Sequence, residues 1–177
     1  MPSYAKFDIW QNTAGVQYST IIQVVQTVKT NTFAASVGAI WGDVPGLSVS
    51  ITPKFSTSRI LVMLDIKYIG DTDVSISRIR LLRDSTPIYI GDSAGSRSQA
   101  SGAQNYTTQA GSGGVNILAS GGIYVDSPAT TSSITYKIQI GGDSNTTVVY
   151  VNRSETDRDT AYYDSRTASS ITVMEIL

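Results

Sequence analysis

Apolar side chains that alternate with polar ones in short segments limit this chain to a small set of folds. Residues 59–68, RILVMLDIKY, carry apolar residues at every second position, namely Ile60, Val62, Leu64, Ile66 and Tyr68. A period of two indicates a β-strand with one buried face, because successive side chains of a strand point to opposite sides. Leu61 and Met63 make the opposite face apolar as well, which predicts a central strand or one covered by another subunit.

Similar segments recur along the chain and are separated by turn residues. They cover 21–30, 47–52, 87–90, 122–125, 134–140, 147–151 and 169–177. Segment 21–30 also fits helical spacing, but its many β-branched residues favour a strand. The apolar phase slips by one residue within 74–83, which predicts a β-bulge. Residues 42–46 contain Gly, Asp and Pro and predict a turn after Trp41, a residue expected in the core or an interface.

The composition agrees with an all-β fold. Charged residues make up 15% of the 177 residues, and Glu occurs only at positions 155 and 175, so strong helix formers are scarce. We expect an antiparallel two-sheet β-sandwich, jelly-roll-like, in one head domain that covers residues 21–177. Residues 1–20 hold an apolar group formed by Phe7, Ile9 and Trp10, and we expect them to be an attachment arm. The alternative for these residues is a strand that packs on the body.

Two long polar stretches interrupt the strands, at 91–121 and at 152–167. Such loops exceed the usual connection lengths and are commonly functional. We expect a binding surface there, built from planar, amide and aromatic side chains. The candidates are Arg97, Gln104, Asn105, Tyr106, Arg158, Asp159, Tyr162 and Tyr163. The alternative for Tyr162 and Tyr163 is that they cover the edge of the core.

Catalysis finds little support in the sequence. The chain has no cysteine and no histidine, which removes thiol chemistry, His-activated nucleophiles and the usual zinc ligands. No phosphate-binding or hydrolase motif is present. Carboxylates that could serve glycoside hydrolysis or calcium binding are Asp71, Asp73, Glu155, Asp157, Asp159 and Asp164. Acidic residues are common in turns for backbone reasons, so we expect no enzyme, no metal and no cofactor.

Charge and hydropathy set further limits. The formal net charge is −1 without a basic stripe, which argues against nucleic-acid binding. No apolar stretch reaches the ~18 residues of a membrane helix, and the N-terminus lacks the apolar core of a signal peptide. We therefore expect no membrane insertion and, for a protein that works outside its cell of synthesis, release by another route such as lysis.

Several segments together resemble the C-terminal domains of bacteriophage tail-fibre and minor structural proteins. They are WQNTAGV (10–16), IIQVVQTVKTNTF (21–33), IWGDVPGLSVSITPKFSTSRILVMLDI (40–66), ITYKIQIGG (134–142) and SSITVMEIL (169–177). The resemblance implies a β-sandwich head that forms a homotrimer, for which Leu61 and Met63 are our interface candidates. It also implies loops that contact a host cell-surface glycan, and an N-terminal side that attaches to a tail or baseplate protein.

These expectations point to a short tail fibre in the phage virion, extracellular after host lysis, that recognises a host receptor. Three alternatives stay open. The first is a virion decoration or adaptor protein without receptor contact. The second is a polysaccharide-degrading tail spike, and the third is a secreted lectin, against which the missing signal peptide counts.

Overall fold

The structure, a computed structural model, describes residues 20–71, 76–105, 117–143, 147–160 and 162–177. These residues form eleven strands and no helix, so the predicted all-β class is confirmed, and no helix in this part of the chain could cross a membrane. The strands are β1 (Ile21–Lys29), β2 (Phe33–Ser36), β3 (Trp41–Ile51), β4 (Arg59–Gly70), β5 (Ile76–Arg83), β6 (Thr86–Ile88), β7 (Gly102–Asn105), β8 (Leu118–Asp126), β9 (Ile134–Gly141), β10 (Val148–Val151) and β11 (Ser169–Ile176).

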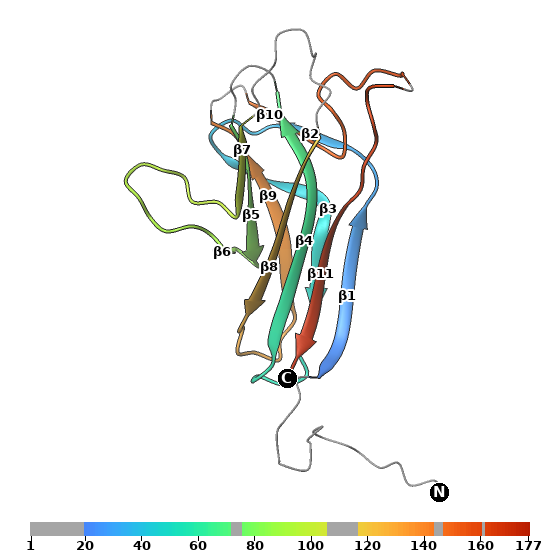
Figure 1. Ribbon diagram of the computed structural model, residues 1–177. Helices are drawn as coiled ribbons and strands as arrows, with labels where there is room; N and C mark the ends of the chain where they lie inside the picture. Colours follow the sequence, from blue (N-terminus) through green and yellow to red (C-terminus); the bar gives the residue numbers. More distant parts are fainter. Residues whose placement is uncertain (1–19, 72–75, 106–116, 144–146, 161) are drawn as a thin grey trace, which may run out of the picture.

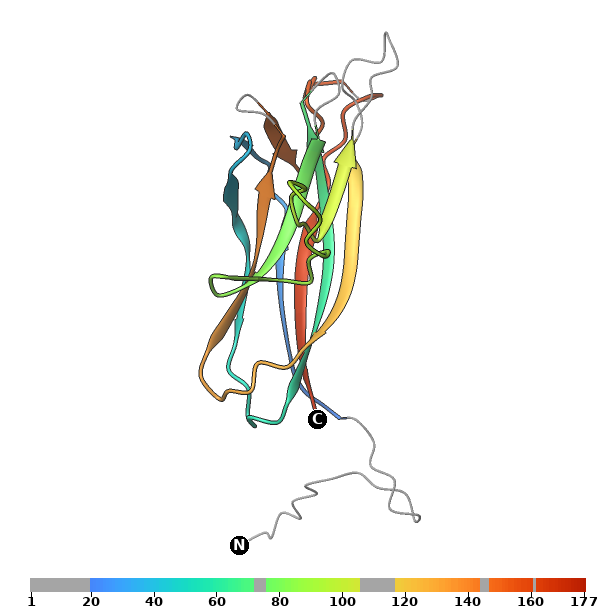
Figure 2. The ribbon, with the colours of Figure 1, turned by 90° about the vertical axis from the view of Figure 1, so that its left-hand side faces the viewer.

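The strands make two antiparallel sheets that pack face to face, as Figures 1 and 2 show. In the larger sheet β4 is central, since it pairs with β8 along one edge and with β11 and β10 along the other. β1 continues this sheet beyond β11, and β2 continues it beyond β10. The smaller sheet has the order β3-β9-β5, and both β6 and β7 pair with the far edge of β5. The predicted two-sheet sandwich is therefore confirmed.

The core lies between the sheets and is built from the alternating positions that the sequence predicts. Five inward residues of β4 are buried, as are four of β9 on the facing sheet. They are Ile60, Val62, Leu64, Ile66, Tyr68, Ile134, Tyr136, Ile138 and Ile140. Burying one such side chain contributes roughly 1.5–3 kcal/mol, so this apolar layer is the main source of stability.

Polar contacts close the two open edges of the sandwich. On one edge the Thr27 hydroxyl of β1 donates to the Ser48 carbonyl of β3 at 2.8 Å. On the other edge Arg83 of β5 forms a two-pronged ion pair with Asp126 of β8, at 2.8 and 2.9 Å. The buried Tyr136 hydroxyl donates to the same carboxylate at 2.6 Å. These contacts hold the two sheets in a fixed position relative to each other.

A buried carboxylate ties the last strand to the connection between β3 and β4. Glu175 of β11 is fully buried and accepts hydrogen bonds from the Gln23 amide at 2.6 Å and from the Lys54 backbone N–H at 2.7 Å. Burial alone would raise the pKa of Glu175, but these hydrogen bonds outweigh it and keep the pKa below its ordinary value.

The two ends of the sandwich have different roles in the chain path. The backbone N–H of Leu177 donates to the Thr20 carbonyl at 3.2 Å, so the start of β1 and the end of β11 lie together. Figures 1 and 2 place these termini at one end and the segment 152–168 at the opposite end. Thr20 and Leu177 therefore lie at the end of the sandwich remote from that segment.

The predicted turn at 42–46 is wrong. β3 runs through these residues, and the extra length is absorbed as a register shift against β9 between Asp43 and Ser48. Gly46 adopts a φ of 81°, so the turn-forming residues produce an irregularity within the strand. Trp41 is half-buried on the outer face of the smaller sheet rather than in the core, with the Arg80 guanidinium carbon 4.4 Å from its ring centre.

Two further expectations need correction. The stretch 91–121 is not one long loop, because it contains β7 and the start of β8. Most inward positions of β8 are not apolar, and the strand owes its place to pairing with β4, from Ile60–Asp126 to Tyr68–Leu118. The bulge expected in 74–83 is absent from its described part: β5 pairs with β7 and β9 without a register shift. Ser77 takes the inward position that an apolar residue would occupy, and Ile76 is exposed instead.

Candidate functional site

The segment between β10 and β11 is a compact loop with a buried base, which we call the 152–168 loop. Asn152 is fully buried and donates to the carbonyls of Lys29 and Asn31, at 2.8 and 3.1 Å. Its side-chain oxygen accepts from the Ser169 hydroxyl at 2.6 Å. Its φ of 61° lies in the left-handed region, which Asn tolerates better than most residues. The loop is thus fixed to the sheet where it begins and where it ends.

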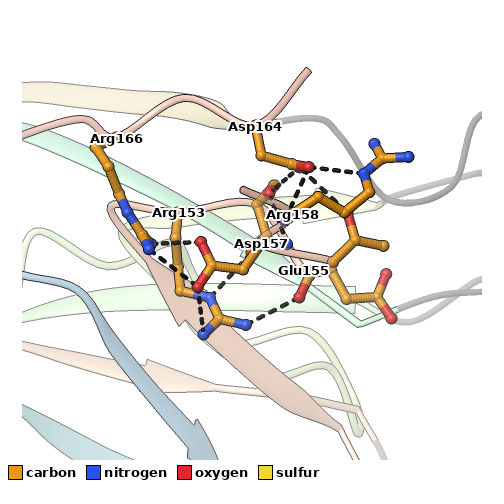
Figure 3. A network of polar contacts seen from close by, with 8 residues as sticks. Arg153, Glu155, Asp157, Arg158, Asp164 and Arg166 are labelled. Atoms are coloured by element: carbon orange, nitrogen blue, oxygen red, sulfur yellow. Dashed lines mark hydrogen bonds and ion pairs between the residues drawn. The ribbon is translucent and has the colours of Figure 1, made fainter. Parts of the chain in front are cut away.

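Asp157 joins the two arms of the loop. Its carboxylate forms ion pairs with Arg166, through Nη1, and with Arg153 at 3.2 Å, as Figure 3 shows. Arg153 also donates to the carbonyls of Ser154 and Glu155, at 3.0 and 2.9 Å. The Arg153 guanidinium carbon lies 4.8 Å from the ring centre of Tyr150 on β10. Asp157 therefore links the two arms of the loop, and the Arg153 guanidinium links the first arm to the sheet.

Asp164 organises the tip of the loop. Its side chain is 2% exposed and accepts hydrogen bonds from the hydroxyls of Ser154 and Thr156 and from two groups of Arg158, the backbone N–H and Nε. Hydrogen bonds from Ser154 and Arg158 hold the pKa of Asp164 far below its ordinary value. The carboxylate is therefore ionised at neutral pH and acts as an acceptor that closes the loop around itself.

The aromatic residues of the loop face solvent. Tyr162 is 91% exposed and Tyr163 is 62% exposed, so the alternative in which they cover the core edge is excluded. The Arg158 guanidinium carbon lies 4.9 Å from the Tyr163 ring centre, within cation–π range. Asp159, beside Arg158, is also exposed. The predicted residues Arg158, Asp159, Tyr162 and Tyr163 thus lie together on one exposed loop.

The arrangement is suited to binding a ligand without large rearrangement. The loop backbone is fixed by buried or nearly buried acceptors, while two rings and a guanidinium remain available at the surface. Exposed tyrosines offer large contact areas at low cost in side-chain entropy, and their faces pack against apolar C–H surfaces. Carboxylates and guanidinium groups beside them supply directional hydrogen bonds.

The other predicted binding residues do not join this loop. Arg97 lies on the connection between β6 and β7, which both ribbon views place on the side of the sandwich, away from the 152–168 loop. Gln104 and Asn105 belong to strand β7 rather than to a loop. Gln104 lies opposite Ser77, a buried residue of β5, so it faces inward. Tyr106 and the arm residues Phe7, Ile9 and Trp10 lie outside the described residues.

Leu61 and Met63, the predicted interface residues, lie on the outer face of the larger sheet. In the strand register Leu61 has Met174 on one side and Val125 on the other, and Val24 follows beyond Met174. The next row pairs Met63 with Ile123, which are 38% and 65% exposed. We call this surface the outer apolar face. It spans β1, β11, β4 and β8.

Sequence reasoning missed the residues that shape the 152–168 loop. Asn152, Arg153 and Asp164 carry no binding signal of their own, since their partners lie in distant strands or across the loop. The Asn152-Arg-Ser triplet reads as a glycosylation sequon, but the buried Asn152 amide is committed to backbone carbonyls. The one available signal was the density of Arg and Asp in 153–166.

Three of the carboxylates considered for catalysis or metal binding serve structural contacts. Asp157 and Asp164 are ion-paired, and Asp71 accepts from the Val148 backbone N–H at 3.0 Å. No group of three or more acidic, His or Cys residues within the described ranges is arranged to hold a metal ion. Asp73 falls outside those ranges.

The chain belongs to the class of antiparallel two-sheet β-sandwiches with a jelly-roll-like arrangement, and it carries the 152–168 loop at one end of the sandwich. No known protein family and no curated protein matches its sequence. Two structures of infectious bursal disease virus resemble it over 99% of the chain, the Gx strain with a TM-score of 0.43 at 8% identity and the Gt strain with 0.45 at 7%. The VP2 subviral particle of the same virus gives 0.37 at 11% identity.

The chain corresponds to less than half of each of those viral chains, 44–46% of their length. Identities and TM-scores of this size carry no inference about a shared site or role.

Proposed function

We propose that this chain is a virion structural protein, a short phage tail fibre whose head recognises a host-surface glycan through the 152–168 loop. The observation that carries the proposal is the pair of exposed rings, Tyr162 and Tyr163, held on a loop that Asp164 and Asp157 fix from within. A rigid loop loses little conformational entropy on binding, so such a surface favours recognition of a fixed epitope.

The direction of the chain supports the same proposal. The described residues begin and end at one end of the sandwich, and the 152–168 loop, which carries the tyrosines, lies at the other. An N-terminal arm at residues 1–20 that docks into a tail or baseplate protein would leave the 152–168 loop pointing outward. This polarity is what a fibre head requires, because attachment and recognition must not compete for one surface.

The proposal includes a homotrimer that uses the outer apolar face. Exposed apolar residues on four adjacent strands form a continuous surface of the kind that marks protein–protein contacts. Leu61 and Met63 lie near its centre, flanked by Val125 and Ile123. Burial of these side chains between subunits would remove the largest apolar surface that the register assembles on this sheet.

The protein acts without catalysis in this proposal. A glycosidase needs a carboxylic acid whose pKa is raised so that it can donate a proton. Asp164, the most enclosed carboxylate of the loop, has a lowered pKa instead, because Ser154 and Arg158 stabilise its charged form. Asp157 is engaged in ion pairs with two arginines of the same loop.

A second candidate function is a virion decoration or adaptor protein that contacts no receptor. The outer apolar face favours it, because the same surface could pack on another virion protein rather than on copies of this chain. Glycan binding separates the two candidates. The tyrosine-loop variants Tyr162→Ala and Tyr163→Ala lose glycan binding if the chain is a receptor-binding fibre. If it is an adaptor, neither the wild type nor the variants bind glycan.

A further inference from the structure

A second surface site lies on the outer face of the smaller sheet. A cavity of about 510 Å³ opens where the connection between β6 and β7 folds over the start of β5. Two alanines complete a lining whose other members are Ile76, Arg78, Ser96, Arg97, Ser98 and Asp143. Its volume falls within the range of small-ligand sites.

Two arginines in this lining form no ion pair with any carboxylate that the structure describes. They are Arg78 and Arg97, whereas all three arginines of the 152–168 loop are ion-paired. One Arg78 nitrogen, Nη2, donates to the Gly142 carbonyl, and its Nε is buried without a hydrogen-bond partner in the described part of the chain. Two guanidinium groups line one cavity, and an anion between them would be attracted to both.

The single acidic residue of the lining is already committed. Asp143 accepts a hydrogen bond from the Ile76 backbone N–H at 3.0 Å and one from the Thr147 hydroxyl at 2.8 Å. The bond from Ile76, together with the one from Thr147 and the nearby Arg78 charge, keeps the pKa of Asp143 low although desolvation opposes this. The lining therefore carries two positive charges against one negative charge that serves to fix the start of β5.

Arg97 is held in place by its own loop. Its backbone N–H and its Nη1 both donate to the Ala94 carbonyl, each at 3.2 Å. The loop is closed at its base, where the Gln99 amide donates to the Gly91 carbonyl at 2.7 Å. Gly95, with a φ of 59°, makes the turn beside Arg97. The cationic wall is thus ordered before any ligand arrives.

The remaining wall is partly apolar. Ile76 is 36% exposed and faces the cavity with the alanines, while Ser96 and Ser98 add hydroxyl groups. An anionic ligand that also has C–H faces and hydroxyl groups would match all three components. A bare inorganic anion would use only the arginines.

We propose that this cavity binds an acidic saccharide unit, with its carboxylate or sulfate between Arg78 and Arg97, its hydroxyl groups at Ser96 and Ser98, and a C–H face on Ile76. This inference deepens the proposed function, on which it rests, by naming an acidic glycan as the receptor class. It adds a second contact surface beside the tyrosine loop.

The test is a titration of the ¹⁵N-labelled full chain, followed by NMR, with methyl β-D-glucuronide and with methyl β-D-glucoside. We expect the glucuronide to shift the amide signals of residues 76–78 and 96–98 and the glucoside to leave them unchanged. The exposed loop substitution Arg97→Gln should weaken glucuronide binding at least tenfold. Arg59→Gln, which removes the same charge from another exposed position, should leave it unchanged, and added salt should weaken binding because the contact is ionic.

Three results would overturn the proposal: no glucuronide shift at these residues, equal binding of the glucoside, or full binding by Arg97→Gln. Inorganic sulfate and phosphate form separate arms: if they shift the same signals and the glucuronide does not, the cavity is a simple anion site and the saccharide inference fails. The titration does not depend on the tyrosines. If the glucuronide does not bind at the cavity but Tyr162→Ala and Tyr163→Ala abolish glycan binding, only the cavity proposal is rejected. If the glucuronide binds at the cavity but the tyrosine substitutions have no effect on glycan binding, the proposed role of the 152–168 loop is rejected.

Discussion

Asp164 and Arg158 are joined twice: one carboxylate oxygen of Asp164 accepts from both the backbone N–H of Arg158, at 3.0 Å, and its Nε, at 2.8 Å. The first bond sets the path of the loop backbone. The second sets the direction of the guanidinium, which lies over the Tyr163 ring. The shape of the loop and the position of its exposed ring therefore depend on one carboxylate.

Asp164→Asn should loosen the tip of the 152–168 loop while leaving the sandwich folded. An amide has one acceptor oxygen where the carboxylate has two, so it cannot accept all four hydrogen bonds. Because the amide is uncharged, it also removes the ion pair with Arg158. We expect faster hydrogen exchange at the amides of Asp157 and Arg158 and unchanged exchange in β4 and β9. Asp159→Asn, a change of the same type at an exposed neighbour, is the matched control. Equal exchange in both variants would contradict the assigned role.

The same carboxylate predicts how the loop responds to pH. Its pKa in the folded protein is lower than the unfolded value of about 3.9. A lowered folded-state pKa stabilises the loop fully above the unfolded value, and this contribution is lost as the pH falls from ~4 toward the folded pKa. Hydrogen exchange corrected for its intrinsic pH dependence should report the same loop protection at about pH 5 and pH 8, with loss only in stronger acid. Loss of protection already at about pH 6 would argue against Asp164 as the organising group.

Asn152→Asp should destabilise the whole sandwich. The substitution keeps the size of the side chain but replaces two hydrogen-bond donors with an oxygen that faces the Lys29 and Asn31 carbonyls. An unsatisfied buried polar group costs about 1–3 kcal/mol, and more when it is charged. In urea unfolding at neutral pH, the free energy of unfolding of Asn152→Asp should be lower than that of Asn152→Ala. Protonation of the introduced carboxyl group in mild acid should narrow this difference. A variant as stable as the wild type would refute the anchor.

Glu175→Gln should also lower the free energy of unfolding, by about 1–3 kcal/mol. The buried carboxylate accepts from the Gln23 amide and from the Lys54 N–H, and a glutamine would turn a donor toward one of them. The comparison is Gln26→Ala, an exposed side chain on β1 whose loss should cost no more than about 0.5 kcal/mol. Equal midpoints for the two variants would show that Glu175 does not hold the β3–β4 connection.

Strands with strict alternation could be predicted in full from the sequence, whereas β8 could be predicted only in part, at 122–125. β4 and β9 follow from their own side chains, because each buries one complete apolar face. β8 has few apolar inward residues and instead has Gly122, where a Cβ would come within 2.8 Å of the Tyr89 ring. Its position is set by that close approach and by the pairing with β4, neither of which is written in its local sequence.

The residues of the candidate sites could likewise be predicted only in part from the sequence. Tyr162, Tyr163 and Arg158 were predicted because their residue types are typical of binding loops. Arg78 was not, since in the sequence it is one of several alternating residues of a strand. Its position on a cavity with Arg97 depends on the loop that folds back over β5, a contact between residues distant along the chain.

Ile123→Glu tests the outer apolar face. Ile123 is 65% exposed, so the substitution should change the stability of a single chain by no more than about 0.5 kcal/mol. A charge on this face would be buried without a partner in an assembly, which is strongly unfavourable. Light scattering should find the wild type at three times the chain mass of 18.9 kDa and the variant at one chain mass.

Ile40→Glu, at a residue that is 72% exposed and lies outside that face, should stay trimeric. A wild-type protein that is monomeric at all concentrations, or a trimer indifferent to Ile123→Glu, would remove this face from the assembly.

Binding of the purified chain to an array of bacterial surface polysaccharides tests the central claim most directly. The account predicts that the wild type binds a distinct subset of glycans. The double variant Tyr162→Ala, Tyr163→Ala, folded as judged by an unchanged urea midpoint, should bind them at least about tenfold more weakly, a loss of ~1.4 kcal/mol. A wild type that binds no glycan, or a double variant that binds as tightly as the wild type, would contradict recognition by the 152–168 loop.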